Sequence, residues 1–439
     1  MNVVVAPAPL SGEVRAPSSK SEAHRLLICA AFAPGTTDID CTTTSADIEA
    51  TVRCLEALGA NITRTRVGFR VRPVPGSSAT DNVPEPAPDA LLDCGESGST
   101  LRFLLPVVAA LGRGGRLTGS GRLPERPLSP LYEELVSHGV TLSPQGEMPL
   151  SVSGKLRPGR FELPGNVSSQ FVSGLLMAAP LMGAPVEVLV REPIESLPYV
   201  TMTVDALARF GAEVSEGDAV SKDGSEARSF VVSAPRGLVS PGTVGVGGDW
   251  SNAAFWLAAG ALGEKGVAVR GLSDRSAQGD RQVLAALALF GARVLRSPDG
   301  AAVEPDHLAG RTIDVRSCPD LVPPLAAVAA VSEGTTRITG AARLRIKESD
   351  RLATVSAAIC ALGGSASIDG DDLVIEGTPR LCGGTVDAAN DHRIAMMAAV
   401  LAVRCEEPVT IVGAECVAKS YPTFFEDLVG LGGSCVKEN

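Results

Sequence analysis

The feature that most constrains the fold of this chain is a short segment that recurs six times. Its copies have the sequences CLEALGANI, ELVSHGVTL, ALARFGAEV, ALALFGARV, ICALGGSASI and DLVGLGGSCV. The shared glycines are Gly59, Gly139, Gly211, Gly291, Gly363 and Gly432, at intervals of 80, 72, 80, 72 and 69 residues. A glycine in this position ends a helix in the left-handed conformation, and the small or β-branched residues after it favour a strand. The regular spacing predicts a repeated helix–strand unit.

A second series of segments runs in phase with the first, and each opens an Ala/Leu-rich helix. Their sequences are PSSKSEAHRLLICAAF, GESGSTLRFLLPVVAAL, GNVSSQFVSGLLMAAP, GDWSNAAFWLAAGAL, PDLVPPLAAVAAV and NDHRIAMMAAVLAV. Each repeat then holds an apolar helix, an amphipathic helix and strands. The alternation of 80 and 72 residues groups the six repeats into three and three. We predict an α/β fold of two similar domains, each with three repeated units, helices buried inside and sheets outside.

The chain length of 439 residues also favours two domains over one core. The Gly-rich stretch Thr243–Gly248 falls between the third and fourth repeats, and Pro7–Ser19 precedes the first. If the first strand, Val3–Val5, joins a sheet of the second half, the chain crosses between domains twice and forms a double-crossover hinge. The predicted domains are residues 19–245 for the first, and residues 1–18 together with 246–439 for the second.

Charge and composition argue against several classes of partner and cofactor. With 39 Lys and Arg against 50 Asp and Glu, the net charge of −11 disfavours nucleic acid and anionic membranes. The most apolar long window, Phe171–Val190, is broken by Pro180 and Pro185 and does not resemble a membrane span. Ten cysteines without a CxxC pair, and four histidines, predict free buried thiols and no metal site. We expect a cytoplasmic monomer without cofactor or metal, with a surface loop at Pro73–Pro88.

Polar residues open the apolar helices, since Ser, Asp or Asn lies at or near the cap in five of the six. Such N-termini carry unpaired N–H groups and about half a positive charge, and several that converge make an anion site. Basic residues gather near these starts: Lys20, Arg25, Arg122, Arg126, Arg343, Arg345, Lys347, Arg351, Arg393 and Lys419. In a net-acidic chain this pattern indicates a site for a small polyanion.

At these residues the chain resembles the enolpyruvyl transferase family, and within it the EPSP synthases. Segments of the family's pattern occur in its order along nearly the whole chain: SSKSEAHR, GESGSTLR, LPERP, NVSSQF, SLPYV, GGDWSN, PDLVPPLA, RIKESDRL, NDHRIAMM and AKSYPTFF. No single segment decides the matter, but ten in register are specific. The resemblance implies transfer of the enolpyruvyl group of phosphoenolpyruvate to the 5-hydroxyl of shikimate 3-phosphate, with these two molecules as the partners.

The resemblance also implies roles for individual residues. Shikimate 3-phosphate would be bound by Lys20, Ser21, Arg25, Ser168, Ser169, Gln170, Ser196, Tyr199, Asp320 and Lys347. Phosphoenolpyruvate would be bound by Lys20, Gly98, Arg126, Gln170, Arg351, Arg393 and Lys419. Arginine suits this substrate because its fork-shaped donors match planar carboxylate and phosphate groups. The catalytic residues would be Asp320, Glu348 and Lys20.

The implied reaction is an addition followed by an elimination. The 5-hydroxyl attacks C2 of phosphoenolpyruvate while C3 takes a proton, and phosphate then leaves as C3 returns the proton. Asp320, kept ionised by nearby cations, would accept the hydroxyl proton, and Glu348 or Lys20 would handle the C3 proton. Because both halves supply implied residues, we expect shikimate 3-phosphate to drive the hinge from an open to a closed state.

Simpler interpretations stay open for several of these positions. Asp320 is also suited to be an N-cap, and Glu348 to be a surface charge paired with Arg351 or Arg345. His392, between Asp391 and Arg393, would then only cap its helix, and His24 would be structural or line the pocket.

Three positions depart from the family's pattern. Many members have Asn where this chain has Glu96 and Arg343, and Pro where it has Phe103. The Gly98, Ser99 and Arg102 positions still match. The departures put local contacts and inhibitor sensitivity in doubt more than the reaction.

Rival functions explain fewer of these features. An enolpyruvyl transferase acting on UDP-N-acetylglucosamine usually has a Cys or Asp general acid in its mobile loop, and Gly112–Arg126 contains neither. A repeat-built binding protein would explain the six repeats, but it would not need Asp320, Glu348 and the basic residues at helix starts. A dinucleotide enzyme is disfavoured because Gly245–Gly248 lacks the GxGxxG order.

Overall fold

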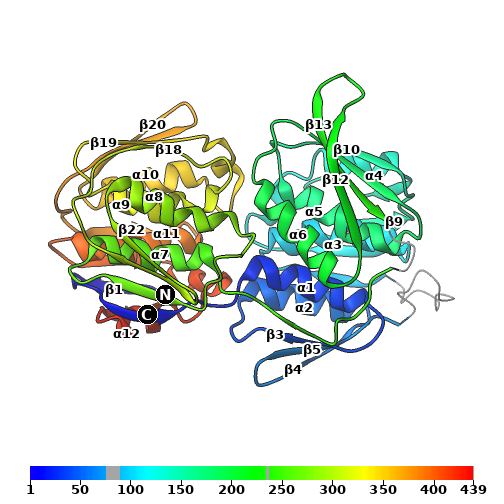
Figure 1. The fold of residues 1–439 in the computed structure, drawn as a ribbon, viewed down its shortest axis with the longest axis horizontal. Helices are drawn as coiled ribbons and strands as arrows, with labels where there is room; N and C mark the ends of the chain where they lie inside the picture. Colours follow the sequence, from blue (N-terminus) through cyan, green and yellow to red (C-terminus); the bar gives the residue numbers. More distant parts are fainter. Residues whose placement is uncertain (76–88, 234–236, 439) are drawn as a thin grey trace. The chain divides into compact units, whose positions relative to one another are not determined.

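The computed structural model describes residues 1–75, 89–233 and 237–438 of the chain. Most of the predicted surface loop, residues 76–88, lies outside this part. The chain divides into two compact units (Figure 1): unit 1 is Met1–Ser19 with Gly247–Asn439, and unit 2 is Lys20–Val246. The domain boundaries predicted from the sequence differ from these by one residue at each crossing.

Each unit has three interior helices that consist mostly of buried residues. They are α1 (Lys20–Phe32), α3 (Gly98–Leu111), α5 (Ser169–Ala178), α7 (Trp250–Leu262), α9 (Val322–Ala329) and α11 (His392–Leu401). All 13 residues of α7 and all ten of α11 are buried. The side chains of Ser97, Ser168, Asp249 and Asp391 accept a first-turn N–H of α3, α5, α7 and α11, which confirms four of the predicted polar helix starts.

The six repeated glycines lie at the ends of amphipathic helices, and all have positive φ, between 77° and 119°. The helices before them are α2 (Ala46–Ala57), α4 (Leu131–Ser137), α6 (Leu197–Arg209), α8 (Val283–Phe290), α10 (Arg351–Ala361) and α12 (Phe424–Gly430). The strands after them are β4 (Asn61–Arg64), β8 (Val140–Leu142), β12 (Glu213–Val220), β16 (Arg293–Ser297), β20 (Ser365–Asp369) and β24 (Ser434–Glu438). The predicted order of helix, left-handed glycine and strand is confirmed in every repeat.

The described residues form six four-stranded sheets with one topology: an edge strand runs parallel to the second, and the third and fourth follow antiparallel. In unit 2, the first sheet has the strand order β14 (Thr243–Gly245), β3 (Thr37–Asp40), β5 (Gly68–Arg72), β4. The second has the order β6 (Leu91–Asp93), β7 (Gly115–Thr118), β9 (Leu150–Gly154), β8. The third has the order β10 (Arg160–Pro164), β11 (Val186–Arg191), β13 (Glu226–Ser233), β12. In unit 1, the first sheet has the order β2 (Gly12–Arg15), β15 (Val267–Arg270), β17 (Gly300–Glu304), β16. The second has the order β18 (Thr312–Asp314), β19 (Thr335–Thr339), β21 (Asp372–Glu376), β20. The third has the order β22 (Gly384–Asp387), β23 (Val409–Val412), β1 (Asn2–Ala6), β24. Figure 1 shows the helices in the interior of each unit and the sheets at its periphery, which confirms the predicted α/β fold.

Strands from distant parts of the sequence complete three of these sheets. In unit 1, β1 lies antiparallel between β23 and β24, and β2 runs parallel to β15. In unit 2, β14 runs parallel to β3. The prediction that Val3–Val5 joins a sheet of the second half is therefore confirmed, and the chain passes between the units after Ser19 and again after Val246.

Small residues allow the interior helices to pack closely. A Cβ added at Gly174 of α5 would lie 2.4 Å from the carbonyl oxygen of Arg102 on α3, so only glycine fits there. Short 3-10 turns connect several elements: η1 (Leu123–Glu125), η2 (Ala179–Leu181), η3 (Gly279–Gln282), η4 (Pro319–Leu321), η5 (Ala342–Ile346), η6 (Ala402–Arg404) and η7 (Ala414–Lys419).

The ten cysteines are all free in the structure. The prediction that they are buried is wrong for Cys360 and Cys382, which are exposed, and for Cys435, which is only partly buried. Cys360 lies on the solvent side of the amphipathic helix α10, and Cys382 lies in the connection that precedes β22. Among the described helices we find none with the length and hydrophobicity that a membrane crossing requires.

Candidate active site

In unit 2, Lys20 is the first residue of α1 and pairs with a carboxylate on α2. Its Nζ lies 2.9 Å from Oδ2 of Asp47, and both side chains are 13% exposed. Asp47 was not singled out from the sequence. It follows the helix cap Ser45 in the first turn of α2, a place where an acidic residue needs no further function. The ion pair restricts where the ammonium group of Lys20 can point.

Arg25 lies one turn further along α1 and is buried in the interior, with 2% of its surface exposed. Its Nε donates to Oγ1 of Thr203 at 2.7 Å, and its terminal nitrogens donate to Oγ of Ser173 and to the backbone oxygens of Ser21 and Tyr199. Burial lowers the pKa of Arg25 to about 10. The guanidinium thus connects two further positions implied for shikimate 3-phosphate, and its own contact with that substrate stays a prediction.

The N-terminus of α5 is joined to that of α3 by side-chain hydrogen bonds. Nε2 of Gln170 donates to Oγ of Ser99 at 2.8 Å, and its Oε1 accepts from Nη1 of Arg102 at 2.8 Å. Ser168 caps α5 by accepting the backbone N–H of Gln170 at 3.3 Å, and the buried Ser169 begins the helix. Two helix starts that carry implied substrate contacts are thereby fixed relative to each other.

Arg126 lies against the start of α3. A Cβ added at Gly98 would lie 2.4 Å from Nη1 and 2.7 Å from Cζ of Arg126, so the guanidinium occupies space that any side chain at position 98 would need. The carboxylate of Glu96 lies beside the segment that leads to Arg126, because a Cβ added at Gly121 would be 2.5 Å from Oε2 of Glu96. Phe103, the other departure in this segment, packs its ring under the buried Arg25 guanidinium, with 4.9 Å between Cζ and the ring centre.

The third implied contact point in unit 2 is the start of α6. Ser196 precedes this helix with φ 58°, a left-handed conformation that few residues other than glycine adopt, and is 1% exposed. Tyr199 lies in the first turn of α6, where its backbone N–H donates to the carbonyl oxygen of Ser196. Of the two alternatives for His24, a structural role or a place in the pocket lining, the structural role agrees with its complete burial and its 2.7 Å hydrogen bond to Thr51.

In unit 1, Asp320 accepts from three cations. Its Oδ1 lies 2.7 Å from Nη1 of Arg351 and 3.3 Å from Nζ of Lys347, and its Oδ2 lies 3.2 Å from Nη2 of Arg393. Burial by itself would raise the pKa of Asp320, but these cations outweigh burial and hold the pKa well below its usual range. The prediction that cations keep Asp320 ionised is confirmed. The alternative of a simple N-cap is wrong, because the cap of α9 is Leu321.

Arg351 connects Asp320 to two further carboxylates and is 1% exposed. Its Nη2 lies 2.7 Å from Oε2 of Glu348, and its Nε lies 2.7 Å from Oδ2 of Asp391. Burial lowers the pKa of Arg351, but Asp391, Glu348 and Asp320 outweigh that effect and raise it. Glu348 therefore pairs with Arg351, as its simpler interpretation expected, but its side chain is only 22% exposed and is not a surface charge.

Asp391 is the second residue that the sequence did not single out for the site. It caps α11 by accepting the backbone N–H of Arg393 at 3.0 Å while it binds Arg351. The interpretation of His392 as the cap is wrong, because the carboxylate of the preceding residue fills that role. A signal was present in the Asp391–His392–Arg393 sequence, but Asp at a helix start is explained by capping alone.

Lys347 is the cation of this cluster whose pKa is lowered toward neutral pH. Burial lowers its pKa to about 8, against the opposing effect of Asp320 and with smaller contributions from Arg351 and Arg343. Arg343, a departure from the family's pattern, thus acts on Lys347 through its charge.

Two more implied positions lie near the start of α11. Arg393 donates through Nη1 to the backbone oxygen of Asp320 at 3.2 Å and through Nη2 to Oγ of Ser251 on α7. Nζ of Lys419 donates to the backbone oxygen of Asn390 at 2.6 Å, in a turn where φ of Asn390 is 54°. Within the described ranges we find no group of three or more His, Cys, Asp or Glu side chains able to hold a metal ion.

Comparison with known proteins places this chain in a family. The sequence profile of EPSP synthase (3-phosphoshikimate 1-carboxyvinyltransferase) matches residues 4–428. The chain belongs to the EPSP synthase family. Proteins named 3-phosphoshikimate 1-carboxyvinyltransferase from Clostridium kluyveri and Clostridium acetobutylicum are 42% and 39% identical to it, over 98% and 99% of this chain and 97% and 98% of theirs.

Solved structures from the EPSP synthase family and beyond share the fold. EPSP synthase from Acinetobacter baumannii matches with a TM-score of 0.78 at 25% identity, covering 99% of this chain and 100% of that one. The enolpyruvyl transferase NikO from Streptomyces tendae matches with a TM-score of 0.73 at 21% identity over 99% and 98% of the two chains. The second likeness concerns the fold alone.

Proposed function

We propose that this protein transfers the enolpyruvyl (carboxyvinyl) group of phosphoenolpyruvate to the 5-hydroxyl of shikimate 3-phosphate, giving 5-enolpyruvylshikimate 3-phosphate and phosphate. The observation that carries the proposal is full-length similarity, at 42% and 39% identity, to relatives named for this activity. The Asp320 cluster supports it, because the addition step needs a carboxylate base beside cations that bind anionic substrates.

In this proposal Asp320 accepts the proton of the 5-hydroxyl as its oxygen attacks C2 of phosphoenolpyruvate. Lys20 or Glu348 gives a proton to C3 and takes it back when the C2–O bond to phosphate breaks. A carboxylate whose pKa is held low is a weak base. The anionic groups of phosphoenolpyruvate would compete for Arg351 and Arg393, weaken their pairing with Asp320, and so raise its basicity when substrate is bound.

The anion-binding roles implied by the resemblance complete the proposal. Arg126, Arg351, Arg393 and Lys419 would bind the carboxylate and phosphate of phosphoenolpyruvate, with Lys20, Gly98 and Gln170. Ser168, Ser169, Gln170, Ser196, Tyr199 and Lys347 would bind shikimate 3-phosphate, with Lys20, Ser21, Arg25 and Asp320. Support comes from the helix N-termini at which most of these residues lie.

The experiment that tests the function is phosphate release from phosphoenolpyruvate with alternative acceptors. We expect release with shikimate 3-phosphate, and none above background with UDP-N-acetylglucosamine or without an acceptor. Release that depends on UDP-N-acetylglucosamine would move the protein to the rival function. Retention of phosphoenolpyruvate under every condition would favour a non-catalytic binding protein.

The hinge motion expected from the sequence belongs to the same proposal. Binding of shikimate 3-phosphate would reduce the radius of gyration in solution scattering, and an unchanged value at saturating ligand would reject the motion. A cytoplasmic, monomeric protein is also part of the proposal, and its free cysteines fit a reducing compartment. Size-exclusion chromatography with light scattering tests the monomer.

A further inference from the structure

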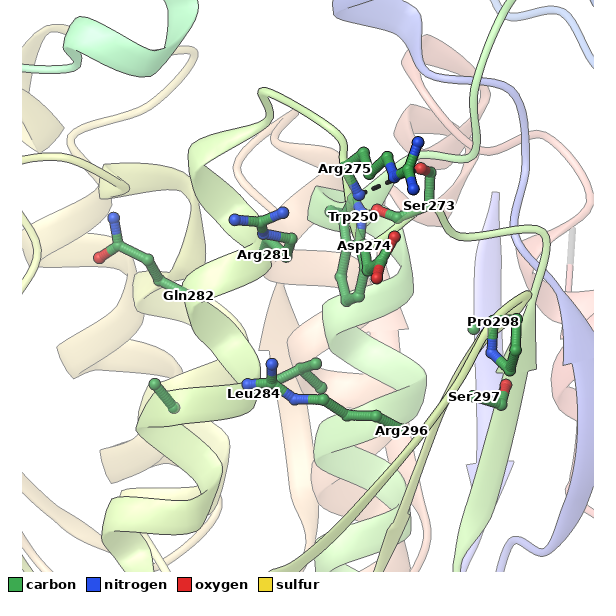
Figure 2. Close-up of a pocket in the computed structure, with 12 residues that line it drawn as sticks. Trp250, Ser273, Asp274, Arg275, Arg281, Gln282, Leu284, Arg296, Ser297 and Pro298 are labelled. Atoms are coloured by element: carbon green, nitrogen blue, oxygen red, sulfur yellow. Dashed lines mark hydrogen bonds between the residues drawn. The ribbon is translucent and has the colours of Figure 1, made fainter.

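Unit 1 contains a cavity whose lining includes none of the residues assigned above to either substrate. Its volume is about 850 Å³, and it lies beside the start of α7, between α8 and the turn that connects β16 to β17 (Figure 2). Pockets for small molecules usually measure roughly 300–1,000 Å³. The cavity therefore has room for a ligand the size of a nucleotide.

Three arginines, Arg275, Arg281 and Arg296, line this cavity. All three are exposed, and among the described residues their guanidinium groups have no ion pair or hydrogen bond. One acidic residue, Asp274, also lines the cavity, so the lining carries an excess of two positive charges. Arg293 lies on the same strand, β16, as Arg296. Unlike Arg296, it does not line the cavity, and it forms an ion pair with Glu304 at 3.3 Å. In a chain with a net charge of −11, such a group of unpaired guanidinium groups attracts anions.

Apolar side chains form the rest of the wall. Pro298 is exposed in the lining, whereas Trp250 and Leu284 contribute only the 2% and 4% of their surface that is not buried. Nε1 of Trp250 donates to the backbone oxygen of Ser273 at 3.1 Å, which fixes its ring. Figure 2 shows Arg281, which belongs to the turn η3 that leads into α8, and the side chain of Arg296, which extends from the strand toward Leu284. The cavity thus combines guanidinium groups, which match phosphate and can stack on a ring, with the exposed apolar ring of Pro298.

We propose that this cavity is a second binding site, for an organic anion that joins a ring to two or more phosphate charges, the class that includes nucleoside diphosphates. Arg281 and Arg296 bind the phosphates, and the ring packs against the exposed Pro298. The site is separate from the Asp320 cluster, although the two are neighbours. Gln282 of the cavity wall accepts from Oγ of Ser317 at 3.1 Å, three residues before Asp320.

Isothermal titration calorimetry with ADP as the probe tests this site. We expect one molecule of ADP bound per chain, and Arg281→Ala and Arg296→Ala each to weaken binding about tenfold or more, because each removes charge-assisted hydrogen bonds. Adenosine, which lacks the phosphates, and inorganic pyrophosphate, which lacks the ring, should each bind at least about tenfold more weakly than ADP. All three substituted arginines in the design are exposed, so the fold should be retained, as melting curves will show.

The matched control is Arg293→Ala, which removes an exposed arginine from the same strand and should leave ADP affinity unchanged. A second control, Lys347→Met, alters the Asp320 cluster and should also leave it unchanged, which excludes binding of ADP at the catalytic position. The proposal is overturned if millimolar ADP does not bind, if binding survives the Arg281 and Arg296 substitutions, or if Lys347→Met abolishes it. Phosphate release measured on the same samples keeps this result distinct from the proposed reaction.

Discussion

The buried arginines of the candidate site are held in different ways in unit 2 and in unit 1. Arg25 and Arg102 of unit 2 donate to hydroxyl, amide and backbone oxygens. Arg351 and Arg393 of unit 1 instead face the carboxylate of Asp320. Neutral oxygens fix a guanidinium without cancelling its charge, whereas carboxylates cancel it and change the proton affinities of the groups around them. The arginines of unit 2 thus keep their full charge for anions, whereas those of unit 1 also influence the protonation of the carboxylate beside them.

The largest effect that this comparison predicts follows from removing the shared carboxylate of unit 1. Asp320→Ala should lower kcat by about 10²–10⁴-fold, the usual contribution of a positioned acid or base. Calorimetry should still detect binding of shikimate 3-phosphate, and Asp320→Asn, which keeps the shape, should be equally slow. Turnover retained in the Asn protein would show that Asp320 only holds its three cations in place.

The corresponding change in unit 2 is Lys20→Met, which removes a cation that is paired with a carboxylate and so resembles the arrangement of unit 1. We expect kcat/KM to fall by about 10²–10³-fold, as for loss of one preorganised electrostatic contact. Steady-state kinetics with Lys265→Met, an exposed lysine, as the control measures this effect. Turnover within about threefold of the parent would reject the role.

A smaller effect concerns proton control in unit 1. Because the pKa of Lys347 is lowered to about 8, its positive charge is lost as the pH rises through that value. The KM for shikimate 3-phosphate should then rise by about tenfold per pH unit at the alkaline end. Substrate binding thus weakens with rising pH, whereas the stability of the fold increases. The folded state binds the proton of Lys347 less tightly than the unfolded state, so stability rises with pH from about 8 toward the usual lysine pKa.

The control for this pH dependence is Lys347→Arg, which stays charged throughout the range. Its KM should lack the alkaline rise, whatever its value at neutral pH. An alkaline rise of the same size in both proteins would assign the titration to another group.

Gly98→Ala tests whether the start of α3 in unit 2 depends on the approach of Arg126. The added methyl group would displace the guanidinium, so the KM for phosphoenolpyruvate should rise by about tenfold, the worth of one charge-assisted hydrogen bond, with little change for shikimate 3-phosphate. Gly430→Ala is the matched control, because no atom lies within 4 Å of a Cβ added there. Equal effects on both substrates would argue against a specific contact.

The smallest expected effect is none. Adding EDTA should leave the rate of phosphate release unchanged, because the proposed chemistry in either unit uses side chains alone. A rate that collapses with chelator and recovers with a divalent metal would contradict this view of both units.

Local features of the fold were predictable from the sequence, and contacts between distant residues were not. Left-handed glycines and Ser or Asp caps are decided within a few residues, so their repetition revealed the six units. The pairing of Lys20 with Asp47 and of Arg351 with Asp391 joins different helices, and each acidic partner already has a local explanation at a helix start. The lowered pKa of Lys347 depends on burial, which no single segment determines.

The position of β1 has a consequence for how the chain assembles during synthesis. Residues 1–19 leave the ribosome before unit 2, but β23 and β24, which flank β1, are made after it. The continuous stretch Lys20–Val246 emerges between them and can complete its own core while the N-terminal strand waits without partners. Because Asn2 pairs with Glu438, the two ends of the described chain are neighbours in one sheet. A circular permutant that joins them through a short linker and opens the chain elsewhere would let unit 1 be translated without interruption.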